Sequence, residues 1–204
     1  MRKQVPVTKG GTENRSNSQE DHMVRYEIDK AHTHVGFTAK HLAVSTVRGQ
    51  FNTFEGYFEG PEDDVTKTSG EVTIDVASID TRTEMRDNHL RSADFFEAEK
   101  YPKITFKLNR VEPVDSESFK VHGDLTIKDT TKPIVLNATL EGRVPDPMGG
   151  GKERLGISAK GQLNRMDFGL NWDGVAGAIP MASHTVKLEI EAEIVVKAAE
   201  LAQA

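Results

Sequence analysis

The chain has 204 residues, no cysteine, and 32 acidic against 26 basic side chains, which gives a formal net charge of −6. The lack of cysteine excludes disulfides, thiolate nucleophiles, thiolate zinc sites and iron–sulfur clusters. The acidic balance argues against nucleic-acid binding, which needs a basic face for the phosphate backbone. No stretch approaches the roughly 18–20 consecutive apolar residues of a membrane-spanning helix.

The first 23 residues differ in composition from everything that follows. They are rich in Lys, Gly, Asn, Ser, Gln and Glu and poor in apolar side chains. Such a segment buries too little surface to offset its ordering entropy, so we predict a disordered leader over 1–23. The pair His22-Met23 leaves open that this leader is an added tag. No apolar run of a secretory signal follows Arg2 and Lys3, and the expected location is therefore cytoplasmic.

From residue 24 onward, apolar and polar side chains alternate with a period of two. The longest run places Val186, Leu188 and Ile190 on one face and Lys187 and Glu189 on the other. This alternation is typical of antiparallel strands with one face buried and one in water. The predicted strands lie at 35–39, 46–58, 72–76, 104–108, 119–127, 134–140, 155–163 and 186–196.

Eight strands separated by short turn sequences predict an all-β domain over 24–198, as a closed barrel or a sandwich, with a tail at 199–204. The alternation shifts by one residue between Phe51 and Phe54, so we predict a β-bulge near Asn52-Thr53. One short helix is predicted at about 82–91, because Thr81-Arg82-Thr83-Glu84 has the pattern of a capping box.

The inward face of these strands carries many small residues beside large aliphatic and aromatic ones. Two interpretations are open: a solid core in which small residues face large ones, or a pore that holds one small ligand. We favour the pore, since seven small side chains share that face: Ala39, Gly49, Gly123, Ala138, Ala159, Gly161 and Ala192. The residues predicted to line the pore and bind the ligand are Val35, Phe37, Ala39, Phe51, Phe58, Val72, Ile74, Phe106, Leu108, Val121, Leu125, Leu136, Ala138, Ile157, Ala159, Leu188, Ile190 and Ala192.

The predicted helix carries a basic stripe. Arg82, Arg86 and His89 follow one another at helical spacing, with Arg91 close behind. One interpretation is a solvated surface face, since Glu84 and Asp87 lie between them. The other is a cationic rim at the pore mouth, formed by Arg82, Arg86, His89 and Arg91, that binds the polar head group of a lipid.

Motifs for catalysis are weak. His32 and His34 at i, i+2 on a strand could begin a zinc or non-haem iron site, but no third ligand is evident among His41, His89, His122, His184 and Asp167. The sequence holds no Gly-x-Ser-x-Gly elbow and no Walker-type loop. We therefore expect a non-catalytic binding protein with neither a cofactor nor a metal.

Short motifs spread along the chain resemble the YceI-like family, whose members are polyisoprenoid-binding proteins with a lipocalin-like barrel. The matching segments are Tyr26-Glu27-Ile28-Asp29, Val35-Gly36-Phe37, Lys40-His41-Leu42, Val47-Arg48-Gly49-Gln50-Phe51, Arg86-Asp87-Asn88-His89-Leu90, Asp94-Phe95-Phe96, Tyr101-Pro102, Ile104-Thr105-Phe106, Gly123-Asp124-Leu125-Thr126-Ile127, Thr131-Lys132-Pro133, Asn164-Arg165, Asp167-Phe168-Gly169 and the strand at 186–194.

The resemblance implies an eight-stranded antiparallel lipocalin-like β-barrel whose apolar pore holds a polyisoprenoid chain, with no established catalytic residues. It also implies that His32 and His41 are ordinary family positions. The leading hypothesis is a carrier or sequestering protein for a polyprenyl chain, an isoprenoid quinone or another long amphiphilic lipid. The alternatives are a metal-dependent enzyme that uses His32 and His34, and a ligand-free structural β domain. A homodimer is compatible with the sequence, and many relatives are exported.

Overall fold

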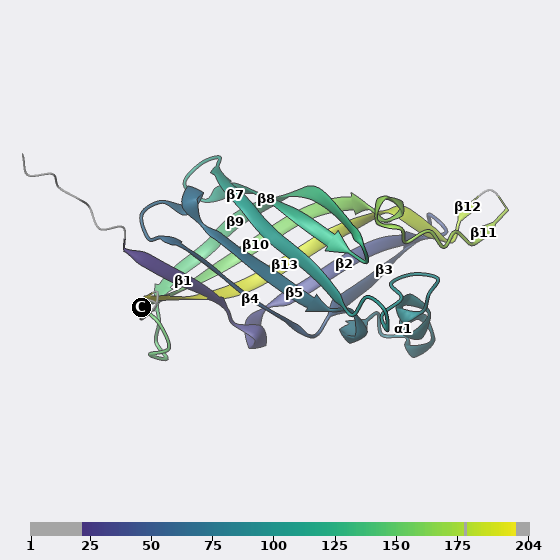
Figure 1. Ribbon diagram of the computed structural model, residues 1–204, viewed down its shortest axis with the longest axis horizontal. Coiled ribbons are helices and arrows are strands. Elements are labelled where there is room, and N and C mark those ends of the chain that lie inside the picture. The colour runs from purple at the N-terminus through teal and green to yellow at the C-terminus, as the bar shows by residue number, and fades with distance from the viewer. Residues whose placement is uncertain (1–21, 178, 199–204) are drawn as a thin grey trace, which may run out of the picture.

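The structure is a computed structural model that describes residues 22–177 and 179–198. Strands make up most of it, and short helical turns join them (Figure 1). The helical segments are η1 (Lys30–His32), η2 (Val65–Lys67), η3 (Val76–Ser78), α1 (Glu84–Arg91) and η4 (Arg165–Phe168). The strands are β1 (Met23–Ile28), β2 (His34–His41), β3 (Ser45–Phe51), β4 (Phe54–Pro61), β5 (Ser69–Asp75), β6 (Ile79–Asp80), β7 (Lys103–Pro113), β8 (Ser118–Ile127), β9 (Thr130–Pro145), β10 (Glu153–Asn164), β11 (Val175–Ala176), β12 (Ile179–Pro180) and β13 (Ala182–Ala198).

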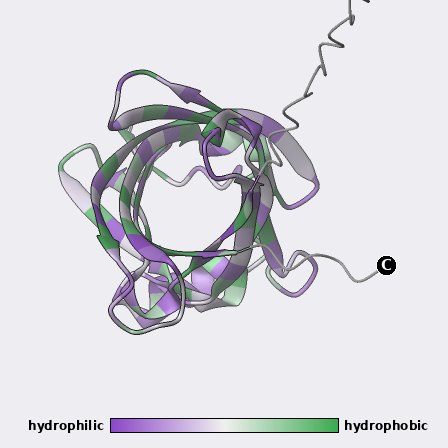
Figure 2. Cartoon of the chain, turned by 90° about the vertical axis from the view of Figure 1, so that its left-hand side faces the viewer, coloured by the Kyte–Doolittle hydropathy of each residue, from purple (hydrophilic) through white to green (hydrophobic). Residues whose placement is uncertain are grey.

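The main sheet closes on itself through β13. Its strand order is β1-β4-β5-β7-β8-β9-β10-β13-β2-β3-β6, and β13 also pairs with β1. The first part of β13 pairs with β2 and the last part with β1, so β1 and β2 together fill one position of the ring. In the same way β3 and β4 together fill the next position of the ring, since β3 pairs with β2 and β4 pairs with β1. The predicted eight-stranded antiparallel barrel is confirmed, and Figure 2 shows the ring of strands from one end.

The predicted irregularity at Asn52-Thr53 is present as a break between two strands instead of a bulge within one. β3 ends at Phe51 and β4 begins at Phe54. Both intervening residues bind Ser78 through their backbone N–H groups. Asn52 donates to the carbonyl oxygen of Ser78 at 3.2 Å, and Thr53 donates to the hydroxyl of Ser78 at 3.0 Å. This break lets the chain leave the β2 pairing and enter the β1 and β5 pairings.

The short helix is confirmed, but its predicted start is wrong. α1 begins at Glu84, and its N-cap Thr83 makes no side-chain capping bond. Thr81 does not cap the helix, because its backbone N–H and its hydroxyl both donate to the buried carboxylate of Asp87. Arg82 lies before the helix with a φ of 63°, in the left-handed region. The local polar network therefore replaces the capping box.

The described strands begin at Met23 and end at Ala198. Met23, the last residue of the predicted leader, is already in β1 and pairs with Pro61. The rest of the predicted leader up to residue 21 and the predicted tail at 199–204 lie outside the described residues. Within the described part of the chain, no helix is long and apolar enough to cross a membrane.

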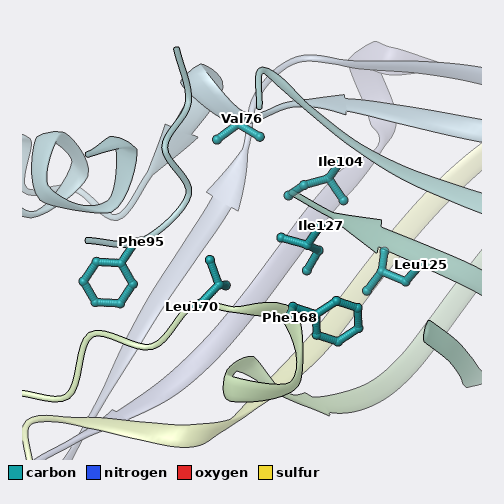
Figure 3. Close-up of a cluster of buried hydrophobic side chains, with 7 residues drawn as sticks. All are labelled: Val76, Phe95, Ile104, Leu125, Ile127, Phe168 and Leu170. Carbon is teal, nitrogen blue, oxygen red and sulfur yellow. The ribbon is translucent and has the colours of Figure 1, made fainter. Parts of the chain in front are cut away.

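A compact apolar cluster packs inside the barrel at the end that carries α1 (Figure 3). It joins strand residues to residues from the segments that cross this end: Phe95 follows α1, and Leu170 follows η4. This cluster contains none of the small inward residues on which the solid-core alternative rested. The cluster consists of Val76, Phe95, Ile104, Leu125, Ile127, Phe168 and Leu170.

Candidate functional site

A cavity of about 790 Å³ runs through the barrel. This volume falls in the upper part of the roughly 300–1,000 Å³ range of small-molecule sites. All 18 residues predicted to line a pore lie on the cavity wall. They are contributed by β2, β3, β4, β5, β7, β8, β9, β10 and β13, because alternate side chains of each strand point inward.

The small inward residues divide into two groups with different roles. Ala39, Ala138, Ala159 and Ala192 line the cavity, and Ala138 pairs directly with Ala159 across β9 and β10. These alanines widen the cavity. The predicted role of the inward glycines is wrong, since their space is filled by neighbouring side chains. A Cβ on Gly49 would meet Phe37, on Gly123 Phe106, and on Gly161 Leu136.

The ionisable groups of the cavity wall differ between the two ends of the barrel. At the α1 end they are all basic: Lys40, His41, Arg86, His89 and Arg165. At the other end the wall contains Tyr26, Glu62 and Arg143. Burial and the nearby Glu62 raise the pKa of Tyr26, so its phenol is neutral over the physiological range.

Only half of the predicted basic rim lies on the wall. Arg86 and His89 line the cavity, whereas Arg82 and Arg91 are not among the lining residues. Arg82 precedes the helix, so the predicted helical stripe is wrong at that residue. The guanidinium of Arg91 donates to the carbonyl oxygens of Ala77 at 2.9 Å and Ile79 at 2.7 Å. Arg91 therefore holds the helix against η3 and β6.

The two helix residues on the wall are held by neighbouring groups. Arg86 donates from Nε to the Thr81 hydroxyl at 2.6 Å. Nε2 of His89 lies 2.9 Å from a carboxylate oxygen of Asp94. The His89 ring also stands edge-on to Trp172 at 5.0 Å. These contacts fix both side chains beside the apolar cavity.

Sequence reasoning missed Arg165 as a candidate site residue. Its side chain is on the cavity wall, yet the residue is only 3% exposed. The guanidinium donates to the carbonyl oxygens of Leu170, Ala182 at 3.2 Å and Ser183 at 3.1 Å. Burial lowers the pKa of Arg165 below its usual value. The pattern gave no signal for this role, because an arginine that follows a strand is usually exposed.

The predicted pairing of His32 with His34 is also wrong. His32 ends η1 and His34 begins β2, so the two imidazoles do not share a strand face. Among the described residues, the group of His and acidic side chains close enough to share an ion is Asp29, His32 and Glu193, whose donor atoms lie within 4.8 Å of one another. None of the three lines the cavity.

The acidic groups of that cluster already bind a cationic side chain, the guanidinium of Arg154. Arg154 donates to Asp29 at 2.8 Å, to Asp146 at 2.7 Å and to Glu193. Its guanidinium lowers the pKa of both Asp29 and Asp146 to about 2. The arrangement is a charge-compensated ion-pair network that ties η1 to β13 and to the β9–β10 turn.

A closed antiparallel barrel around an apolar cavity defines the class of β-barrel proteins that can enclose a small apolar ligand. The chain belongs to the YceI family, since the YceI-like domain matches residues 26–194. It is similar to protein YceI of Escherichia coli O157:H7, with 39% identity over 170 residues that cover 82% of this chain and 85% of that protein.

Two solved structures are similar to this fold. The YceI protein of Campylobacter jejuni is 38% identical, with a TM-score of 0.65 over 81% of this chain and 94% of that one. A polyisoprenoid-binding domain from Saccharophagus degradans, implicated in plant cell wall breakdown, is 16% identical, with a TM-score of 0.60 over 83% and 97% of the two chains. The second likeness is one of fold.

Proposed function

We propose that the protein binds a long-chain isoprenoid-type lipid, a polyprenyl chain or an isoprenoid quinone, inside the barrel and acts as its carrier or sequestering protein. The observation that carries this proposal is the apolar cavity whose wall is built from the inward side chains of the whole ring. The similar fold of the polyisoprenoid-binding domain of Saccharophagus degradans supports the proposal.

The apolar tail supplies most of the binding free energy. Burial of each CH₂ contributes about 0.8 kcal/mol, so ~20 buried carbons contribute ~16 kcal/mol before costs. Association and ordering oppose this with about 4–15 kcal/mol. An apolar chain alone therefore reaches micromolar or tighter affinity, and contacts with a head group select among lipids.

We assign the polar head group to the α1 end of the cavity. The ionisable side chains of the wall at that end are basic, and His89 stands edge-on to the ring of Trp172. The opposite end carries both signs, with Glu62 near Arg143, and the pKa of Glu62 is lowered by its bond to Lys152. An anionic or strongly polar head is therefore stabilised more at the first end than at the second.

Direct identification of the ligand tests the proposal. Native mass spectrometry of the freshly purified protein, followed by organic extraction, should show a co-purifying isoprenoid-type lipid. Bound zinc or iron would support the metal-enzyme alternative instead, and a protein without any ligand would support a structural domain.

An optical titration provides an independent test. Trp172 is the one tryptophan of the chain and lies on the cavity wall, with its ring 5.4 Å from that of Phe95. Farnesol entering the cavity changes the surroundings of this indole, so its fluorescence should shift and saturate. A flat titration with farnesol and with longer polyprenols would contradict the proposal.

A further inference from the structure

Two loops at the α1 end expose apolar side chains next to each other. Val44, in the turn between β2 and β3, is 85% exposed, while Val175 and Ile179, in the β11–β12 hairpin, are 59% and 48% exposed. Figure 1 shows this hairpin extending beyond the barrel at the end that carries α1. We name these three residues together with Met181 the apolar tip.

The two loops form one continuous surface. The backbone N–H of Leu42 donates to the carbonyl oxygen of Met181 at 3.2 Å, and that of Met181 donates to Gly174 at 2.7 Å. Met181 is 37% exposed and also lines the cavity. The apolar tip is therefore continuous with the cavity wall, and the apolar path from cavity to surface runs through Met181.

The charges next to the tip are mainly basic. Residues 42–47 and 174–183 contain no charged side chain, and the first of these segments is flanked by the exposed cations Lys40 and Arg48. The second segment follows Asp173, whose carboxylate lies 3.3 Å from Nε2 of His184 and 3.5 Å from the guanidinium of Arg165. The chain as a whole has a formal net charge of −6. An anionic surface thus repels most of the molecule and attracts this part of it.

The opposite end of the barrel offers a comparison. Val114 and Met148 are exposed there too. However, Val114 lies between Glu112 and Asp115, and Met148 follows Asp146 closely in the chain. Neither residue lines the cavity. The β2–β3 turn at the α1 end differs from both, because the stretch from Lys40 to Arg48 around the exposed Val44 contains no acidic side chain.

The backbone of the β2–β3 turn strengthens this contrast. Leu42 and Ala43 both adopt the left-handed conformation, with φ of 50° and 59°. Asn and Gly are the residues that such a turn normally favours, and they would also be better solvated. An apolar Leu-Ala-Val sequence at an exposed, strained turn is costly for the free chain, which points to a role in binding.

We propose that the apolar tip docks on an anionic phospholipid bilayer and places the α1 end of the cavity against the surface from which the lipid ligand is taken up. Apolar side chains flanked by cations are the features that hold a protein at the interface of such a bilayer. The uptake step rests on the proposed function, whereas the docking step stands on the surface alone.

Vesicle flotation tests the docking step. The full chain should float with vesicles of phosphatidylcholine and phosphatidylglycerol, less with phosphatidylcholine alone, and less at high salt. In the variant Val44→Ser/Ile179→Ser the partition coefficient should fall about tenfold or more, because two large apolar side chains no longer enter the interface. Arg48→Gln should lower it about fivefold on the anionic vesicles.

The matched control is Val114→Ser/Met148→Ser, which removes exposed apolar side chains from the opposite end and should leave flotation unchanged. Equal flotation of the Val44→Ser/Ile179→Ser variant and the original chain would overturn the proposal. The proposal would also be overturned if the original chain did not float and instead formed a dimer that the Val44→Ser/Ile179→Ser substitutions dissociate. That result would assign the tip to self-association.

A solution titration keeps this test separate from that of the proposed function. Neither Val44 nor Ile179 lines the cavity, so the variant should show the same Trp172 response to farnesol as the original chain. Uptake of a polyprenol from vesicles should nevertheless slow by the same factor as flotation falls. If farnesol did not change the Trp172 fluorescence of the original chain, the cavity proposal would be contradicted. The flotation experiment would still test docking by itself.

Discussion

The ring of Phe106 on β7 lies over Gly123 on the neighbouring strand β8. A Cβ built on Gly123 would meet Cζ of that ring at 2.3 Å and the carbonyl oxygen of Lys107 at 2.6 Å. The ring could turn into the adjacent cavity, but the carbonyl belongs to a paired strand and cannot. Glycine at this position therefore serves close packing of the barrel wall and not the width of the cavity.

Gly123→Ala should lower the free energy of unfolding by about 1–3 kcal/mol, the usual cost of adding a group to a filled site. Urea unfolding followed by circular dichroism measures this change. Gly142→Ala is the matched control, since a Cβ on Gly142 would have nothing within 4 Å. A stability of Gly123→Ala equal to that of the control would contradict the packing found here.

Filling the cavity tests whether its alanines provide space for a ligand. Ala159 is buried on the cavity wall and pairs with Ala138 on the neighbouring strand, so Ala159→Phe places a ring inside the barrel. We expect the saturating Trp172 response to polyprenols to be lost or strongly weakened, while unfolding stays cooperative. Gln162→Phe, at an exposed position of the same strand, adds the same ring outside and should bind normally. Normal binding by Ala159→Phe would place the ligand elsewhere.

The strand pattern predicted the cavity wall well because a closed barrel obeys one simple rule. Side chains alternate between inside and outside, so Phe37, Ala159 and Ile190 could be assigned to the interior from spacing alone. The same rule could not separate the alanines that widen the cavity from the glycines that receive a ring. That distinction depends on cross-strand register, such as the pairing of Leu108 with Gly123, which a single sequence does not specify.

The polar parts of the site were less predictable. The stripe through Arg82 assumed a helix start that a buried hydrogen bond between Thr81 and Asp87 prevents. Arg165 was missed because its partners are carbonyl oxygens of segments far along the chain or beyond a turn. Local propensity does not contain such tertiary contacts, and they decide where a charged side chain points.

Acid should weaken the barrel through the Arg154 network. The pKa values of Asp29 and Asp146 are about 2 in the folded protein, below the roughly 3.9 of an unfolded aspartate. Both groups then bind protons more readily in the unfolded state. Their contribution to stability is complete above pH ~4 and is lost as the pH falls toward about 2.

Urea unfolding at a series of pH values checks this expectation against Arg154→Gln. That variant should be less stable at neutral pH, because three carboxylates lose their shared cation. Its stability should also fall less steeply between pH ~4 and about 2, since the pKa of each aspartate returns toward its usual value. Parallel curves for the two proteins would mean that other carboxyl groups cause the acid sensitivity.

The head-group assignment is tested by two ligands with the same tail. Arg86 lines the cavity and Arg82 does not, although both were predicted to form the rim. A charge-assisted hydrogen bond is worth about 1.5–3 kcal/mol, and solvent screening reduces this at a half-buried site. Arg86→Gln should therefore weaken the binding of farnesyl diphosphate about tenfold and hardly change that of farnesol.

Arg82→Gln is the control and should affect neither ligand. Competition titrations at low and high salt measure both affinities, and the salt dependence should decrease in Arg86→Gln alone. Equal losses for the two ligands would show that Arg86 supports the fold through its bond to Thr81 and does not contact the head group.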